Sequence, residues 1–367
     1  MIILLSLIGL LSVTTVLFTR QSKFGKAPSG ARLEAFKKSP HFKNGKFQNL
    51  SHTPQLTEGH HMTGVLVEFL FKKKERRRPA GLIPSVKTDL IHLNIKEDVL
   101  VWFGHSSYFI QLDSKRILVD PVFSGNASPI QGSNKAFNGA DRYSSEDMPE
   151  IDYLLITHDH WDHLDHTTLV ELIPKVKQVI CGLGVGSHLE YWGYAAEKII
   201  ERDWYEEIVL NDDFVIHTAP ARHFSGRAFS RNNTLWLSYV LKSPTMKIYI
   251  GGDSGYDVHY KAIGEKHGPF DLVILENGQY DKTWKYIHHM PEEVLQAAVD
   301  LQAKRLLPVH SGKFVMANHP WDEPLIRITE ANKNAVHSIP LVTPVIGEKV
   351  FLKEANQIFR EWWEEVG

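Results

Sequence analysis

The sequence contains a single cysteine, Cys181, among its 367 residues. One thiol cannot form an intramolecular disulfide, and it cannot build a cysteine-based zinc site. Any bound metal must therefore be held by histidine, aspartate or glutamate, and the chain has 20 histidines. Excess positive charge is missing as well. The formal net charge is −2, which argues against a dedicated nucleic-acid-binding protein.

The sequence also has no internal repeat of the solenoid kind and no low-complexity tract. Hydrophobic residues make up 43% of the chain and charged residues 23%, a composition typical of a globular protein. The length allows one large domain with an appendage or two ordinary domains. We expect three parts: a helix at 1–19, an extended arm at 20–88 and a catalytic domain at 89–367.

Residues 2–18 carry no charged side chain. As a helix they would be about 25 Å long, at the short limit for spanning a bilayer. We expect a single-pass membrane anchor. The alternative is a cleaved signal peptide, although Leu17-Phe18-Thr19-Arg20 is a poor cleavage site. Basic residues follow this segment, so the positive-inside rule favours a cytoplasmic catalytic domain over an exported one.

A second basic run lies at Lys72 to Arg78, within the predicted arm. It fits either a solvated loop or a contact with anionic lipid headgroups. In the second case each cation near the surface adds on the order of 1 kcal/mol of binding free energy. An anchor upstream favours the second interpretation, so a membrane surface is an expected partner.

The pattern changes from Ile91 onward, where short strand-like runs are separated by polar turns. Strand candidates lie at 99–103, 108–112, 117–119, 151–157, 179–181, 214–218, 234–242, 247–250, 271–275 and 305–309. Helix candidates lie at 167–176, 186–192 and 291–302. Strands first, and then strands alternating with helices, predict two sheets with helices packed outside.

The run His158-Asp159-His160-Trp161-Asp162-His163 directly follows one of these strand candidates. Alternate residues at a strand end project in similar directions, so His158 and His160 can bind one ion together. The chain then turns, and Asp162 and His163 can face a second ion. A lone histidine is more often an ordinary surface or core residue, but four potential ligands within six residues are rare by chance.

Three further residues follow strand candidates in the same way: His223, Asp253 and His310. Each is a weak signal alone. Together with the first run they give enough ligands for two divalent ions that share a carboxylate. Imidazole and carboxylate ligands suit zinc, which we expect first, and also manganese or iron(II).

The segment from Thr157 to His163 resembles the signature of the metallo-β-lactamase superfamily. That resemblance implies an α/β fold, a four-layer αββα sandwich, here preceded by an N-terminal apolar helix and the extended arm. The chain is more closely similar to the branch of N-acyl-phosphatidylethanolamine-hydrolysing phospholipase D and its bacterial relatives. The similarity covers about 94–324, and it is carried by Trp102-Phe-Gly-His105, Leu118 to Ser124 with Ala127-Ser-Pro129, Gly252 to Tyr256, His289 to Glu293, Leu306 to His310 and His319 to Pro324. A weaker likeness lies upstream, at Pro40 to Asn49.

The resemblance also implies a division of the ligands. One ion would be held by His158, His160 and His223, the other by Asp162, His163 and His310, with Asp253 bridging. His105 and Asp120 would orient ligands or loops, although both also fit ordinary turn residues. The family usually has tryptophan after the last ligand histidine. This chain has Ser311 there, which would widen the site.

In such a site two ions would activate a bridging water, with Asp162 and Asp253 as catalytic residues that orient it. His289 is the candidate proton donor to the leaving group, although a helix-capping role before Pro291 fits it equally. We expect its neighbour His288 to point elsewhere. The predicted activity is that of a phosphodiesterase on N-acyl-phosphatidylethanolamine-like phospholipids.

Other functions remain open at this point. A lactonase or cyclic phosphodiesterase with a soluble substrate is the main alternative, because the L-ascorbate-6-phosphate lactonases have similar motifs. Redox di-iron relatives carry glutamate where this chain has His160, and they usually add a flavin-binding domain. A membrane-tethered pseudoenzyme is disfavoured by the intact ligand types, and a nuclease by the near-neutral charge. A homo-oligomer is compatible with the sequence.

Overall fold

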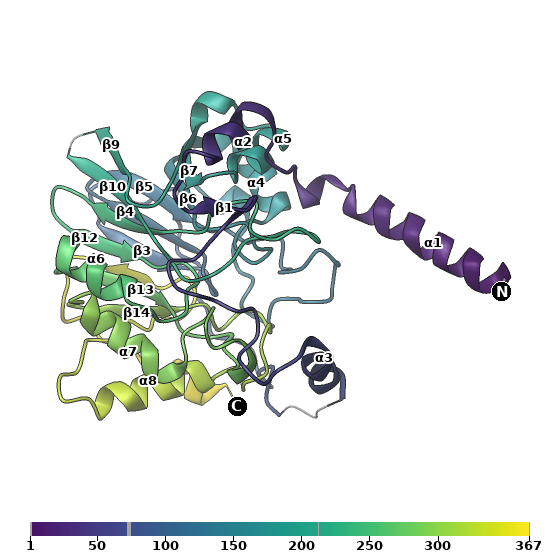
Figure 1. Cartoon of the computed structure of the whole chain (residues 1–367). Helices are drawn as coiled ribbons and strands as arrows, with labels where there is room; N and C mark the ends of the chain where they lie inside the picture. The colour runs from purple at the N-terminus through teal and green to yellow at the C-terminus, as the bar shows by residue number, and fades with distance from the viewer. Residues whose placement is uncertain (1, 72–74, 212, 367) are drawn as a thin grey trace.

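Two β-sheets stacked face to face form the body of the protein, with helices on the outer side of each sheet (Figure 1). The computed structural model describes residues 2–71, 75–211 and 213–366. The strands of the first sheet have the order β15-β3-β4-β5-β6-β7-β8. Their bounds are β3 (Val99–Trp102), β4 (Tyr108–Leu112), β5 (Lys115–Val119), β6 (Ile151–Ile156), β7 (Val176–Gly182), β8 (Ile199–Arg202) and β15 (Lys349–Phe351).

The second sheet has the order β14-β13-β12-β11-β10-β9. Its strands are β9 (Glu207–Asn211), β10 (Phe214–Ala219), β11 (Ser238–Lys242), β12 (Lys247–Ile250), β13 (Leu272–Glu276) and β14 (Leu306–Val309). The strands pair in parallel from β5 through β6 and β7 to β8 in the first sheet and from β12 through β13 to β14 in the second, whereas the other neighbours, including β15 with β3, are antiparallel. The carboxyl ends of β6, β12 and β14 lead into the segments that carry the predicted ligands.

Three hydrophobic cores separate four layers of secondary structure. Helices α4 (His166–Leu172) and α5 (Gly186–Tyr191) cover the first sheet. Helices α6 (His259–His267), α7 (Pro291–Asp300) and α8 (Glu323–Lys333) cover the second. The largest core lies between the two sheets. This arrangement is the predicted order of helix, sheet, sheet and helix.

Strand β6 shows how the sequence produces this layering. Leu154 and Ile156 face the core under α4, whereas Tyr153 and Leu155 face the core between the sheets. Side chains alternate along a strand, so a strand that is covered on both faces needs an almost continuous apolar run. That requirement explains why Tyr153 to Ile156 is a continuous apolar run rather than an alternating pattern.

The N-terminal segment contains more regular structure than the extended arm predicted for 20–88. It forms α2 (Gly30–Phe36), α3 (Met62–Phe71) and a small hairpin of β1 (Phe42–Lys43) and β2 (Lys46–Phe47). Phe36 and Phe47 are buried in the large core, and Arg32 pairs with Glu190 and Glu201. These apolar and ionic contacts bind the segment to the main body, and they explain its local order.

Helix α1 (Ile2–Thr19) extends away from the main body (Figure 1). Within the described residues, no helix has both the length and the apolar character needed to cross a membrane. The predicted single-pass anchor at 1–19 therefore has no support from the structure. At 1.5 Å per residue, the 18 residues of α1 span about 27 Å, whereas a bilayer core is about 30 Å thick. The first three residues of the second basic run, 72–74, lie outside the described residues.

Candidate metal centre

The loop that carries the first predicted ligands is fixed where β6 ends. The carboxylate of Asp120, which follows β5, accepts hydrogen bonds from the Thr157 backbone N–H at 2.9 Å and from its hydroxyl at 2.6 Å. Both residues are buried. Because β5 and β6 are parallel neighbours, their ends lie side by side, and this bridge sets the direction in which the chain leaves the sheet.

One ligand cluster consists of His158, His160, His223 and Asp253. The Nδ1 atom of His160 lies 2.9 Å from Nε2 of His158 and 3.1 Å from Nε2 of His223. Ligand atoms around one zinc ion, with bonds of roughly 2.0–2.1 Å, lie roughly 3.3 Å apart. This set of nitrogens and one carboxylate therefore has the composition and the spacing of a site for one divalent ion.

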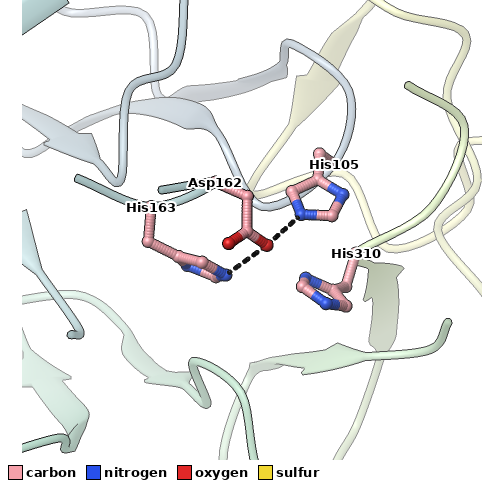
Figure 2. Close-up of side chains that lie close together, drawn as sticks. All are labelled: His105, Asp162, His163 and His310. Carbon is pink, nitrogen blue, oxygen red and sulfur yellow. Dashed lines mark hydrogen bonds and ion pairs between the residues drawn. The ribbon is translucent and has the colours of Figure 1, made fainter. Parts of the chain in front are cut away.

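The second cluster consists of His105, Asp162, His163 and His310 (Figure 2). Asp162 lies between two of the rings, because its Oδ2 is 2.8 Å from Nε2 of His105 and 3.4 Å from Nε2 of His163. Asp253 joins the two clusters, since its Oδ2 lies 3.2 Å from Nε2 of His163 and 3.8 Å from Nε2 of His158. All seven predicted ligands are thus brought together, with Asp253 between the groups.

The electrostatics of these side chains also suit a metal. Burial lowers the pKa of four imidazoles below the usual value for histidine: His158, His160, His223 and His310. Neutral imidazole is the form that binds a metal. The Nε2 atom of His310 is buried and has no hydrogen-bond partner among the described residues. An unpaired buried nitrogen is costly, and a metal ion would satisfy it.

His163 behaves differently from the other rings. Burial disfavours its charged form too, but the carboxylates of Asp253 and Asp162 outweigh burial and raise its pKa well above the usual value. Its Nδ1 lies 2.8 Å from Oδ2 of Asp120. A carboxylate on the far nitrogen orients a ligand histidine and fixes its tautomer. The predicted orienting role of Asp120 agrees with this contact, and His105 contacts Asp162 in a comparable way.

Contacts with other parts of the chain hold two more ligands. The side chain of Asn49, in the N-terminal segment, accepts from the backbone N–H of His223 at 3.1 Å and donates to its carbonyl at 2.7 Å. The Ser106 hydroxyl lies 2.8 Å from Nδ1 of His310. Neither contact was predicted from the sequence. Asn49 lies at the end of the weaker region of resemblance, which was the only available signal for it.

Three residues of the centre have backbone conformations that are unfavourable for side-chain-bearing residues. The φ angles are 54° for His105, 41° for Asp120 and 67° for His310. Non-glycine residues adopt the left-handed region at a cost of order 1–3 kcal/mol, and such residues cluster at functional sites. The surrounding hydrogen bonds therefore hold these side chains in place against a local preference for other conformations.

The structure places the two neighbouring histidines differently from the sequence expectation. His289 is buried and stacks near Tyr260, at 5.2 Å between ring centroids, outside the ligand clusters. His288 instead joins a third group of potential ligands with Asp253, Glu276 and His310. Its Nδ1 lies 2.6 Å from Oε2 of Glu276, and burial raises the pKa of that carboxyl well above the usual value.

Two cavities open onto the centre. The larger has a volume of about 670 Å³ and is lined by the end of α1, by Phe24, Trp161 and Phe229, and by the ligands His160 and Asp162. The smaller has a volume of about 270 Å³ and lies beside α3; it is lined by the same two ligands and also by His223 and Asp253. Ser311 lines neither cavity. It is buried, and its backbone carbonyl accepts from the His105 N–H at 2.9 Å.

Comparison with known proteins identifies the family of this chain. The family model of the β-lactamase superfamily domain matches residues 115–311. The chain belongs to the metallo-β-lactamase superfamily. It is 35% identical over 331 residues to an uncharacterized protein of Mycobacterium tuberculosis, covering 89% of this chain and 87% of the relative. It is 31% identical over 233 residues to the N-acyl-phosphatidylethanolamine-hydrolyzing phospholipase D 1 of Caenorhabditis elegans, covering 59% and 64% of the two chains.

A solved structure supports the same assignment of fold. The metallo hydrolase Igni18 of Ignicoccus hospitalis superimposes with a TM-score of 0.52 at 20% sequence identity, covering 70% of this chain and 98% of that chain. Membership of the metallo-β-lactamase superfamily and the ligand clusters together make the chain a metal-dependent hydrolase.

Proposed function

We propose that this protein is a dinuclear, zinc-dependent phosphodiesterase that hydrolyses N-acyl-phosphatidylethanolamine-like phospholipids. The larger cavity carries the proposal, because it offers an apolar wall directly beside the metal ligands His160 and Asp162. A lipid places a charged phosphodiester next to long apolar chains, and this cavity provides both environments. The similarity to a nematode phospholipase of that specificity supports the same substrate class.

Helix α1 is part of the wall of this cavity. Phe18 packs edge-on against Phe24 at 5.2 Å, and Phe24 packs in the same way against Trp161 of the ligand loop at 5.1 Å. Thr14 and Thr15 also line the cavity. The end of α1 is thus linked through three aromatic rings to the segment that carries the ligands, so we assign it a role in holding an acyl chain.

Metal binding and orientation of the attacking water are assigned to residues of the two clusters. The two clusters, with Asp253 between them, would hold two divalent ions, which supply Lewis acidity and activate water when bound. A water oxygen would attack phosphorus, and the bond from phosphorus to the alcohol oxygen of the N-acylethanolamine would break. The products are phosphatidic acid and that alcohol. Asp162 and Asp253 are placed to orient the attacking water.

His288 is the best-placed group for the proton that the leaving oxygen needs. It lines the smaller cavity beside Asp253, and the Glu276 carboxyl holds its Nδ1 at 2.6 Å. Glu276 is itself fixed, because its Oε1 accepts the backbone N–H of His289 at 2.8 Å. A histidine held by a carboxylate on one nitrogen presents its other nitrogen in a defined direction.

A membrane surface is the proposed partner, and a membrane-associated location with a cytoplasmic catalytic domain goes with it. Large apolar side chains are exposed on both helices beside the cavities, among them Leu10 and Leu17 on α1 and Phe71 on α3. Phe229, at the rim of the larger cavity, is 82% exposed. Exposed apolar groups beside a cavity large enough for an acyl chain favour uptake of substrate from a bilayer.

The test is turnover of N-acyl-phosphatidylethanolamine in mixed vesicles by full-length protein loaded with zinc. Release of phosphatidic acid and N-acylethanolamine is expected, and Asp253→Asn should abolish it. A panel of soluble lactones and cyclic phosphodiesters runs in parallel. Turnover of a soluble substrate without any lipid turnover would overturn the proposal.

A further inference from the structure

Arg231 lies where the two cavities meet. It lines both of them, together with His160, Asp162, Phe224 and Met316. Two of these lining residues are candidate metal ligands, and the other two are apolar. The guanidinium group is therefore the cationic side chain that the two cavities share at the metal centre.

The contacts of Arg231 leave its charge without a counter-ion. Its guanidinium carbon lies 4.8 Å from the centre of the Phe224 ring, and its N–H groups face the side-chain oxygen of Gln55 once that amide is oriented to accept. Among the described residues, no carboxylate forms an ion pair with it. A half-buried charge without an opposite charge is unfavourable unless a ligand supplies one.

Arg227, four residues earlier in the same loop, differs from Arg231 in its hydrogen-bond partners. It is buried, and its guanidinium donates to the backbone carbonyls of Asp159, Leu164 and Lys23. It also stacks on Trp161, at 4.0 Å from the ring centre. The donors of Arg227 are occupied within the protein, so this residue is structural. Arg231 instead lines both cavities, and its N–H groups have only the neutral Gln55 amide as a partner among the described residues.

We propose that Arg231 binds the anionic group of the substrate and so selects charged over neutral lipids. A guanidinium group donates two parallel hydrogen bonds to a phosphate, and this geometry positions the phosphate as well as attracting it. The apolar parts of the substrate would then occupy the two cavities on either side. Identifying the anion as a phosphodiester rests on the proposed function, whereas the binding of an anionic amphiphile does not.

The test compares two single-chain amphiphiles below their micellar concentrations, the anionic octyl phosphate and the neutral octyl glucoside. Each is titrated calorimetrically into zinc-loaded, full-length protein. Arg231→Gln should weaken octyl phosphate binding roughly 10- to 100-fold, the range for hydrogen bonds to a charged group. Octyl glucoside affinity should change less than about threefold, since neutral–neutral contacts at the cavity wall contribute little selectivity.

Two further variants separate charge from packing. Arg231→Lys keeps the charge and should recover part of the octyl phosphate affinity. Arg142→Gln removes an exposed arginine that lies outside both cavities, and it should bind both amphiphiles like the wild type. Thermal unfolding of every variant checks that the fold is intact.

The inference is overturned if Arg231→Gln leaves octyl phosphate affinity unchanged, or if it lowers both affinities by the same factor. Failure of the proposed function gives a different pattern. In that case N-acyl-phosphatidylethanolamine is not hydrolysed, while the Arg231-dependent preference for octyl phosphate persists. The two conclusions therefore stand or fall on separate measurements.

Discussion

Replacing Asp120 by asparagine should weaken metal binding without touching a ligand. The carboxylate receives the Thr157 N–H at 2.9 Å, the Thr157 hydroxyl at 2.6 Å and Nδ1 of His163 at 2.8 Å. Asparagine keeps one oxygen, which can still accept from the Thr157 backbone. Its amide N–H₂ then faces the protonated Nδ1 of His163, donor against donor. The imidazole must rotate or move its proton to Nε2, and a protonated Nε2 cannot bind a metal.

The expected loss of affinity is 10- to 100-fold, the usual effect of removing a residue that orients a ligand. This factor corresponds to about 1.4–2.7 kcal/mol of binding free energy. The measurement is a zinc titration of the purified protein against a chromophoric chelator. Asp152→Asn is the matched control, because Asp152 also accepts a backbone N–H, from Arg116 at 2.9 Å, but lies at the opposite end of β6. Equal zinc affinity in the two variants would refute the reasoning.

Four further outcomes are expected. His288→Gln should lower kcat about 10²- to 10⁴-fold with the zinc content unchanged, and a wild-type rate would exclude the proton-transfer role. Asn49→Ala should lower the free energy of unfolding in urea by about 1–3 kcal/mol, against almost no change for the exposed Asn356→Ala. Deleting residues 2–19 should reduce the turnover rate of lipid but leave the turnover rate of a small soluble diester within twofold of the wild type. Equal losses for both substrates would show that α1 does not contribute to lipid binding. Burial raises the pKa of the Cys181 thiol, so iodoacetamide should label it only after denaturation.

The candidate metal ligands could be predicted because they lie in segments that directly follow strand candidates in the sequence. A continuous apolar run marks a strand covered on both faces, and the first polar residues after it must lie at the sheet edge. Parallel pairing puts the ends of β5 and β6 at one edge of the first sheet and the ends of β12, β13 and β14 at one edge of the second, and the stacking of the two sheets brings these edges together. The same rule applied to β13 would have found Glu276, the last residue of a buried strand.

Local sequence could not show which of His288 and His289 lies beside the candidate metal ligands. The two rings point in different directions, and which one faces the metal ligands depends on the loop conformation before α7. That conformation is fixed by Glu276, which holds the His288 ring and the His289 backbone from another strand. A tertiary contact of this kind leaves no periodic pattern in the chain.

The edges of the sheets and the N-terminal segment were missed for a related reason. Strand β15 has only three residues, and β8 has two charged residues among its four, so neither shows a continuous apolar run; both are sheet edges. Helix α2 has seven residues, and it is held by tertiary contacts such as the pairing of Arg32 with Glu190. Short elements of this kind owe their stability to packing rather than to intrinsic propensity.

The ligands come from both sheets, and this gives the centre an order of assembly during synthesis. The cluster with His158, His160 and His223 is complete once Asp253 has been made, whereas the other waits for His310, after the last strand of the second sheet. During synthesis, the residues of the first cluster are therefore all made before the second cluster is complete. A second ion held there would join the loop after β6 of the first sheet to the residue that follows β14 of the second.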